Sequence, residues 1–491
     1  MMHDDASLLI RNAGMGFGVD VADVRLRLGI IAAVGPALPG LQDETVFDAG
    51  GAALLPGLHD HHIHLQALAA ASLSLHCDAT SPDGGASLGA RLRAADAEGD
   101  SHQWLRVTGY HEDIAGDIDR DWLDRHVAAR PVRVQHRSGR LWIFNTRALE
   151  LLRADEAGTP LERRSQRATG RLYDADAWLR QRLDHRRPSL ALISRRLASY
   201  GVTGVTDVTP GNALADFEHF ADCQRRGELL QRVTMMGNAG LDHAIASDML
   251  SAGGTKVHLH EHDLPDFDAF CALIRHSHGV GRPVAVHCVT APELAYALSA
   301  LTESGSVPGD RIEHAALVPA DWLPVMRAAG ITVVTQPNFV AERGDSYLKA
   351  LPASEAAGLY RAGSLLAAGV PLAAGTDAPF GDPDPWRAMQ AAVDRRTAAG
   401  RVLGPAERLS PEAACTLFLG AAVDPAGPAR RIAAGAPADL CLLDRSWQEA
   451  RRALHAVRVQ WSLRGGRFIW RQAYAAVGLN AVEQHCCRAV L

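Results

Sequence analysis

Pro56-Gly57-Leu58-His59-Asp60-His61-His62-Ile63-His64 is the stretch that decides the fold of this chain. The apolar run of residues 52–55 leads directly into it, so a buried strand is expected to end in the paired histidines. Alternate side chains of a strand face the same way, and His62 and His64 can therefore bind one metal ion from one wall of a site. Parallel barrels place their catalytic residues at such strand ends. The stretch predicts the first strand of a metal-dependent barrel enzyme.

Seven further apolar runs follow, mostly at spacings that suit strand–helix units of about 30 residues. They cover residues 204–208, 232–236, 255–260, 283–288, 311–314, 331–335 and 371–377. Together with the first strand they predict an α/β fold, in which residues 56–424 form a TIM-like (β/α)8 barrel.

One gap between the predicted strands is much longer than the others. About 140 residues separate the first strand from the second, and a structureless loop of that length does not fit a compact domain. Residues 76–190 are therefore expected to form a long insertion after barrel strand 1, with a structure of its own. Because the insertion leaves and rejoins at the barrel rim, it is expected to roof the active site.

Both ends of the chain contain short runs in which apolar and polar residues alternate between glycine turns. Residues 24–28 are one such run, and residues 457–461 are another. Alternation with a period of two is typical of half-buried strands, which are expected to pair antiparallel here. Residues 1–55 and 425–475 are therefore predicted to form a small β-sandwich domain built from both termini.

The composition of the 491-residue chain excludes several classes of partner. Its net charge is −6 and it has no polybasic run, so neither nucleic acid nor an anionic membrane is an expected partner. No apolar run reaches the roughly 18 residues of a membrane span, and the acidic start lacks the features of a signal peptide. The eight cysteines form no Cys-x-x-Cys pair, which fits a reducing compartment. We therefore expect a cytoplasmic protein that acts on a small molecule.

Lysine is almost absent from this chain. Of its 50 basic residues only Lys256 and Lys349 are lysines, and the others are arginines. An amine can lose its proton and react far more readily than a guanidinium, so a retained lysine can indicate chemistry. Drift in a GC-rich genome would also leave two lysines by chance, and the surroundings of Lys349 are those of a helix surface. Lys256 lies on a predicted barrel strand, where a chemical role is the better interpretation.

Five predicted barrel strands end in residues suited to metal chemistry. These residues are His62 and His64, Lys256, His287, His314 and Asp377. A single buried histidine is more often a hydrogen-bonded core residue. Several on separate strands are hard to explain in that way, because the carboxyl ends of barrel strands converge on one pocket. The pattern therefore predicts a metal site.

Motifs along nearly the whole chain resemble those of the amidohydrolase superfamily. Residues 56–64 are similar to its first-strand signature, residues 311–315 and 375–379 to its sixth and eighth strands, and residues 436–440 to its C-terminal sandwich strand. The insertion, with Arg-Pro-Val at 130–132 and Thr-Gly-Arg-Leu at 169–172, resembles the amidohydrolase-3 branch, which includes N-substituted formamide deformylases. These motifs are specific for fold and metal use but poorly specific for substrate.

The resemblance implies a binuclear zinc site. The ligands that it implies are His62, His64 and Asp377 for one Zn²⁺ ion and His287 and His314 for the other, with Lys256, carboxylated by CO2, as the bridge. A metal-activated hydroxide would be the nucleophile, and Asp377 would take its proton and pass it to the leaving amine. Relatives often have Asp-Gly shortly after this lysine, whereas residues 257–261 are Val-His-Leu-His-Glu, a departure that bears on the bridge. Asp60 shares the face of the paired histidines and is expected to support them.

Four residues are predicted to contact the substrate: His111, Arg140, His258 and Gln336. Arg140 stands where related chains have a histidine, and it is interpreted either as a ligand for a substrate carboxylate or as a surface arginine. By strand alternation His258 faces the same way as Lys256, so it would touch substrate or metal, or else lie in solvent at the rim. Gln336 follows the seventh strand at the rim.

Three functions are compatible with this pattern. The first is a metal-dependent hydrolase that cleaves a C–N amide bond in an N-acyl, N-formyl or cyclic amide. The second is a mononuclear zinc deaminase of a heterocycle or amine, but such enzymes have a glutamate soon after the strand-5 histidine, whereas Glu293 lies six residues beyond His287. The third, a non-catalytic binding protein, has no need for an open metal site. The first is therefore expected, and a homodimer is compatible with it because relatives are commonly dimers.

Overall fold

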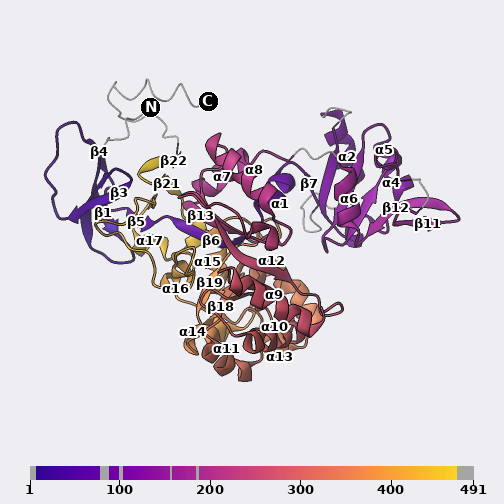
Figure 1. The fold of residues 1–491 in the computed structure, drawn as a ribbon. Coiled ribbons are helices and arrows are strands. Elements are labelled where there is room, and N and C mark those ends of the chain that lie inside the picture. Colours follow the sequence, from indigo (N-terminus) through magenta and orange to yellow (C-terminus); the bar gives the residue numbers. More distant parts are fainter. Residues whose placement is uncertain (1–6, 78–87, 99–102, 155–157, 184–186, 473–491) are drawn as a thin grey trace. The chain divides into compact units, whose positions relative to one another are not determined.

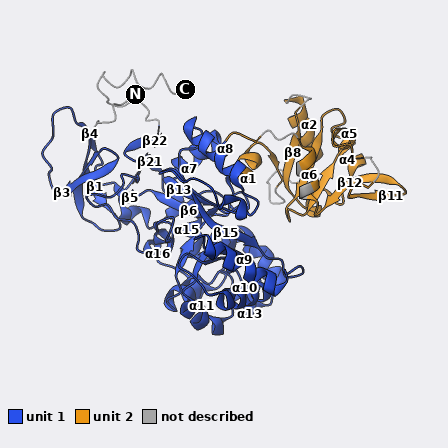
Figure 2. Cartoon of the chain, viewed as in Figure 1, with its two compact units in different colours: residues 1–65, 190–491 blue, residues 66–189 orange. Residues whose placement is uncertain are grey.

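The computed structural model describes residues 7–77, 88–98, 103–154, 158–183 and 187–472. It divides into two compact units: residues 1–65 and 190–491 form unit 1, and residues 66–189 form unit 2 (Figure 2). Both segments of unit 1 flank unit 2 in the sequence. Unit 2 is therefore a long insertion that follows the first barrel strand.

Eight parallel strands form the barrel of unit 1, hydrogen-bonded in the order in which they occur along the chain (Figure 1). They are β6 (Leu58–Ile63), β13 (Val202–Asp207), β14 (Arg232–Gly237), β15 (Leu250–His258), β16 (Val284–Cys288), β17 (Arg311–His314), β18 (Thr332–Thr335) and β19 (Leu372–Ala374). β15 begins at Leu250 rather than at Thr255, because Leu250 already pairs with Val233 of β14. The barrel fold expected from the apolar runs is confirmed.

The barrel nearly closes where the ends of β6 and β19 meet. The main-chain N–H of Asp377 donates to the carbonyl of His62 at 2.8 Å, and that of His64 donates to the carbonyl of Ala378 at 2.9 Å. A side chain at Gly375 would clash with the main chain of His62, so glycine permits this close approach. The first and eighth strands therefore present their terminal side chains to the same site.

Asp60 joins the same two strand ends from within the core. Its carboxylate, which is fully buried, accepts hydrogen bonds from the N–H of Thr376 at 3.0 Å and from the hydroxyl of Thr376 at 2.5 Å. It also accepts from the main-chain N–H of His62 at 3.1 Å. Burial raises the pKa of Asp60 to about 6, although these hydrogen bonds act in the opposite direction. Asp60 thus supports the main chain of His62 rather than its imidazole ring.

Helices follow most of the barrel strands, as expected of a βα barrel (Figure 1). They are α7 (Ala191–Ser199), α8 (Leu214–Arg225), α9 (Phe267–Gly279), α10 (Ala291–Ser304), α11 (Leu323–Ala329), α12 (Asn338–Ala350), α13 (Ala353–Ala357), α14 (Ala362–Ala367), α15 (Pro385–Asp394) and α16 (Pro411–Thr416). α10 shows how the sequence sets a helix start, because Thr290 and Glu293 form a capping box with a proline in the first turn.

The sandwich domain of unit 1 is one continuous sheet built from both ends of the chain. Its strands are β1 (Leu8–Met15), β2 (Val21–Arg27), β3 (Ile30–Gly35), β4 (Thr45–Asp48), β5 (Ala53–Pro56), β20 (Leu440–Leu443), β21 (Val459–Arg464) and β22 (Arg467–Arg471), and the short helix α17 (Trp447–Ala450) follows β20. β1 pairs antiparallel with β2, and β2 with β3, as the alternating runs predicted, and β1 also pairs parallel with β4 and β5. Buried side chains such as Leu26, Leu54 and Trp461 give this domain its own core.

Unit 2 contains a six-stranded sheet in the order β11-β12-β10-β9-β8-β7. Its elements are α1 (Leu65–Ser72), β7 (Leu75–His76), α2 (Leu88–Ala97), β8 (Leu105–Tyr110), α3 (Glu112–Ala115), α4 (Arg120–Asp124), β9 (Val132–His136), β10 (Leu141–Phe144), α5 (Thr146–Leu151), β11 (Leu161–Arg164), β12 (Arg167–Tyr173) and α6 (Asp176–Arg182). Two buried apolar clusters, one around Val107 and Val134 and one around Phe144 and Leu172, form its cores. Among the described residues of the whole chain, no helix combines the length and the apolar character that a membrane crossing requires.

Candidate metal centre

The carboxyl ends of the barrel strands bring the predicted histidine ligands together. His62 lies in β6 and His64 directly follows that strand, while His287 lies in β16 and His314 ends β17. The ring centroids of His62 and His64 are 5.6 Å apart, those of His62 and His314 are 4.7 Å apart, and those of His314 and His287 are 4.4 Å apart. The four imidazoles therefore form one continuous cluster.

Asp377, which follows β19, completes a trio of ligands with the paired histidines. Its Oδ1 lies 3.3 Å from Nε2 of His62 and 3.2 Å from Nε2 of His64. The three ligand atoms all lie within 4.8 Å of one another, a spacing that a single ion can bridge. Burial alone would raise the pKa of Asp377, but His62 and His64 hold it well below its usual range. Asp377 is therefore a carboxylate at neutral pH.

Backbone geometry explains how His314 joins this cluster. In the pairing of β16 with β17, His287 lies opposite Glu313 and Cys288 lies opposite His314, so strand alternation turns Glu313 inward. His314 reaches the site because its φ of 70° turns the chain at the end of the strand, and Asp377 does the same with a φ of 56°. Positive φ is uncommon outside glycine and is concentrated at functional sites.

The imidazoles of His287 and His314 are held in their neutral form. Burial, with His314 beside it, lowers the pKa of His287 well below its usual value, and burial lowers the pKa of His314 to about 3. Nδ1 of His314 lies 2.6 Å from the amide oxygen of Gln336, which accepts a hydrogen bond and so fixes the proton on Nδ1. Nε2 of His314 then keeps the lone pair that a metal ion needs.

Lys256, in β15, has a buried amine with no hydrogen-bond partner among the described residues. Only 6% of the residue is exposed. Burial lowers the pKa of Lys256 to about 8, while the negative charges of Glu313 and Asp377 oppose this effect. An amine in this environment has an accessible free-base form, which is the nucleophilic one.

Glu313 is a further functional candidate, which the sequence pattern alone did not reveal. Its carboxylate is fully buried, and it bonds to Nδ1 of His62 through one oxygen and to Nε of Arg311, at 2.5 Å, through the other. A carboxylate on Nδ1 orients an imidazole and leaves Nε2 to bind a metal, so Glu313 supports His62 as a ligand. Alternation along β17 puts Arg311 and Glu313 on one face, and the pairing of Glu313 with His287 shows that this face is the inward one.

The imidazole and carboxylate groups at the barrel strand ends suit Zn²⁺ or a similar divalent ion. Imidazole nitrogens together with a carboxylate oxygen are the ligand set that zinc favours in enzymes, and a trio of ligands leaves a further position open. The trio of His62, His64 and Asp377 provides such a set, and the neutral rings of His287 and His314 lie beside it. The unpartnered amine of Lys256 is a polar group that a bound ion or a covalent modification would satisfy.

His258 and Gln336, both predicted to contact substrate, lie next to the metal-ligand cluster. His258 pairs in register with His287, and their ring centroids are 3.9 Å apart. The ring of His258 also stacks on that of His260 at 4.4 Å. Gln336 is fully buried against His314, so it lies behind a ligand rather than at the rim.

His111 and Arg140, the other two predicted substrate contacts, lie in unit 2. The guanidinium of Arg140 donates two hydrogen bonds to the carboxylate of Asp174, at 2.7 and 2.6 Å. This is the bidentate geometry that a substrate carboxylate would use. His111 is the N-cap of α3, where its Nδ1 accepts from the N–H of Asp113 at 3.2 Å.

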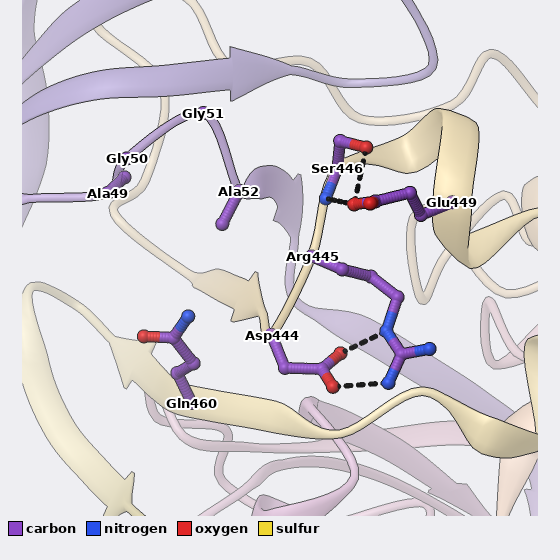
Figure 3. A pocket seen from close by; sticks show the side chains of 9 residues that line it. All are labelled: Ala49, Gly50, Gly51, Ala52, Asp444, Arg445, Ser446, Glu449 and Gln460. Atoms are coloured by element: carbon purple, nitrogen blue, oxygen red, sulfur yellow. Dashed lines mark hydrogen bonds and ion pairs between the residues drawn. The ribbon is translucent and has the colours of Figure 1, made fainter.

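A pocket of about 580 Å³ lies in the sandwich domain, and no histidine lines it (Figure 3). Its lining residues are Ala49, Gly50, Gly51, Ala52, Asp444, Arg445, Ser446, Glu449 and Gln460. Two hydrogen bonds join Asp444 to Arg445, and Ser446 donates to Glu449, so the charged groups of this pocket are already paired (Figure 3). The candidate metal ligands lie instead at the strand ends of the barrel.

The sequence of residues 45–470 matches the model of the amidohydrolase family, which is most of the chain. The chain belongs to the amidohydrolase family. It is therefore an enzyme of the metal-dependent amidohydrolase superfamily, as the strand-end motifs predicted. A comparison with curated proteins finds no match, so the likeness to formamide deformylases stays a prediction.

Solved amidohydrolase-like structures share the fold of this chain. An uncharacterized metal-dependent hydrolase from Pyrococcus furiosus is 20% identical with a TM-score of 0.72, and the match covers 90% of this chain and 100% of that one. N-isopropylammelide isopropylaminohydrolase from Burkholderia multivorans is 20% identical with a TM-score of 0.53, covering 95% and 98%. An adenosine deaminase from Xanthomonas campestris with bound zinc is 17% identical with a TM-score of 0.53, covering 95% and 93%. Identities this low establish the common fold only.

Proposed function

We propose that this amidohydrolase hydrolyses a C–N amide bond of a small molecule, such as an N-acyl, N-formyl or cyclic amide, in the cytoplasm. The observation that carries the proposal is the His62, His64 and Asp377 trio together with Lys256. The buried amine of Lys256 has no hydrogen-bond partner among the described residues, and its charge acts on both His287 and His314. Water is the second reactant, and the products are a carboxylic acid and an amine.

Two Zn²⁺ ions fit this arrangement. His62, His64 and Asp377 would hold one ion, and His287 and His314 would hold the other, with Lys256 between them. When bound, such ions lower the pKa of a water molecule and polarise a substrate carbonyl. The free amine of Lys256 would add to CO2 to form a carbamate and release a proton, which turns the side chain into an anionic oxygen ligand.

Asp377 is the residue proposed to move protons. It is deprotonated at neutral pH because the neighbouring histidines lower its pKa, and its carboxylate can accept a proton from the attacking water. The same carboxylate would then donate that proton to the leaving nitrogen. Glu313 would hold the His62 ring in place throughout, since it occupies Nδ1 of that ring.

The mononuclear deaminase is the second candidate, and one observation counts against it. Both carboxylate oxygens of Glu293 are engaged by main-chain N–H groups: one accepts from Val289 at 2.8 Å and from Thr290 at 3.1 Å, and the other from Glu261 at 3.1 Å. The residue is 3% exposed. Glu293 is therefore used to hold loops together, and the Asp377-centred hydrolase is the better supported function.

A substrate screen separates these two functions. The zinc-loaded enzyme would be offered N-acyl amino acids, formamides and cyclic amides, with aminated heterocycles as the comparison set. Release of a carboxylic acid and an amine supports the proposal, and Asp377→Asn should reduce that rate by roughly 10²–10⁴-fold. Release of ammonia from the heterocycles alone would contradict it and favour the deaminase.

Lys256 can be tested directly because the chain has only one other lysine. After incubation with isotopically labelled bicarbonate, carbon NMR should detect one carbamate signal in the wild type. The signal and one bound zinc per chain should disappear in Lys256→Met, while Lys349→Met, on the exposed face of α12, serves as the matched control. A Lys256→Met variant with the zinc content of the wild type would contradict the bridge.

A further inference from the structure

Unit 2 contains a second cluster of possible metal ligands, at the carboxyl ends of β8 and β9. These strands pair in parallel, with Tyr110 opposite His136, and the N–H of Arg137 donates to the carbonyl of Tyr110 at 2.8 Å. His111 and Glu112 directly follow β8, and His136 ends β9. The main-chain pairing therefore holds the three side chains next to one another.

The atoms that face one another in this cluster are two imidazole nitrogens and one carboxylate oxygen. Oε2 of Glu112 lies 3.3 Å from Nε2 of His136 and 3.6 Å from Nε2 of His111. One ligand atom from each residue lies within 4.8 Å of the other two. An ion placed among them would have two nitrogen ligands and one oxygen ligand, the set found in many zinc enzymes.

The other nitrogen of each ring already has an oxygen partner. Nδ1 of His111 lies 3.0 Å from a carboxylate oxygen of Asp113, and Nδ1 of His136 lies 2.7 Å from the hydroxyl of Ser138. When the ring proton is on Nδ1 it can be donated to these oxygens, and Nε2 is left with a free lone pair. Metal-binding histidines usually donate their ring proton to such an oxygen. Nδ1 also faces the N–H of Asp113 or Ser138, at 3.2 and 3.1 Å, which favours the other tautomer until an ion binds.

Exposure makes the cluster accessible to an ion. The Glu112 side chain is 48% exposed, whereas those of His111 and His136 are 23% and 15% exposed. An ion can therefore enter from solvent on the carboxylate side, while packing holds the rings in place. Binding would replace weak, solvent-screened histidine–carboxylate contacts with coordinate bonds.

We propose that His111, Glu112 and His136 form a binding site for a divalent transition-metal ion such as Zn²⁺, separate from the ligands of the barrel. The ion would link the turn after β8 to the end of β9, adding coordinate bonds to the main-chain hydrogen bonds and weak side-chain contacts there. A solvent molecule would complete its coordination. Because no barrel residue takes part, the proposal stands or falls independently of the proposed amide hydrolysis.

Zinc stoichiometry of the full chain tests this site. Metal-free protein would be dialysed to equilibrium against Zn²⁺, and bound zinc per chain would be compared among variants. His136→Gln should bind one zinc fewer than the wild type. The double variant His62→Asn/His136→Gln should likewise bind one zinc fewer than His62→Asn alone. His126→Gln is the matched control, because that unit 2 histidine faces Arg93 at 2.7 Å instead of a carboxylate, and it should keep the full number.

A second variant guards against misfolding of the first. Glu112→Gln changes an exposed carboxylate and leaves both rings in place, so it should fold normally and also lose one zinc. Circular dichroism would verify that the variants are folded. Wild-type zinc content in both His136→Gln and Glu112→Gln would overturn the proposal.

Discussion

At the scale of single residues, Glu313 is the side chain whose role the structure defines most sharply. Its carboxylate occupies Nδ1 of His62 and is itself held by Arg311, which also donates to the carbonyl of His61 at 2.9 Å. Replacing a hydrogen-bonded carboxylate behind a metal ligand typically weakens metal binding by about 10–100-fold. Glu313 therefore belongs to the site as much as the ligands do.

We expect Glu313→Gln to weaken zinc binding to the barrel within that range, because a neutral amide orients and polarises the His62 ring less well. Competition with a chromogenic chelator would measure the affinity. Glu412→Gln is a suitable control, since Glu412 bonds to Trp447 at 2.9 Å in unit 1 and touches no barrel histidine. Equal zinc affinity in wild type and Glu313→Gln would show that the carboxylate has no such role.

The sequence was sufficient to identify the candidate ligands, because strand ends of a parallel barrel converge whatever the details of the backbone. It was not sufficient for Glu313, whose inward orientation depends on pairing in register with His287. Strand alternation would also have sent His314 outward, and only its positive φ brings it into the site. Gln336 looked like a rim residue because its burial behind His314 depends on packing across strands.

At the scale of elements, the eight barrel strands and the antiparallel pairing of β1, β2 and β3 were predictable, whereas the parallel pairing of β1 was not. Buried parallel strands are continuous apolar runs, which sequence shows directly. The parallel pairing of β1 with β4 and β5 depends on the direction in which the chain runs when it comes back alongside β1. Alternation of apolar and polar residues within a strand does not encode that direction.

One ion pair in the sandwich domain gives a pH-dependent prediction. Glu44, whose side chain has no exposed surface, is bound by Nε of Arg25 at 2.7 Å, and its pKa is lowered to about 2 mainly by this hydrogen bond. A lowered pKa means that the stabilisation is complete above the unfolded-state pKa of about 4.3 and is lost as the pH falls toward the folded-state value. Glu44→Gln should therefore lower Tm at pH 7.

The difference in Tm between wild type and Glu44→Gln should narrow as the pH is lowered from neutral into the acid range. Thermal melts followed by circular dichroism would measure it. Glu355→Gln, at an exposed position of α13, is the control and should change Tm little at any pH. A Tm difference that stays constant with pH would contradict the ion-pair explanation.

At the scale of the whole molecule, two units with separate cores make up the chain. The sequence indicated the second unit only through the length of the gap between strands, because nothing in its composition marks a sheet. That His111 and Arg140 of unit 2 contact the substrate stays a prediction.

Units with separate cores are expected to unfold in separate steps. Scanning calorimetry of the His136→Gln chain, in which only the barrel can bind zinc, should show two transitions. Zinc at a hundredfold excess over Kd should stabilise one of them by about 2.7 kcal/mol for each bound ion, while the temperature of the other transition stays unchanged. A single transition, or an equal shift of both, would contradict the independence of the units.

We propose that the barrel strand ends of this amidohydrolase hold metal ions between His62, His64, Asp377, His287, His314 and Lys256. Anomalous diffraction at the zinc absorption edge, from crystals of the zinc-loaded full chain, tests it most directly. We expect two anomalous peaks in the barrel, with a carboxylated Lys256 between them. One peak beside an unmodified lysine would contradict the bridged pair, and no peak at these residues would contradict the metal centre itself.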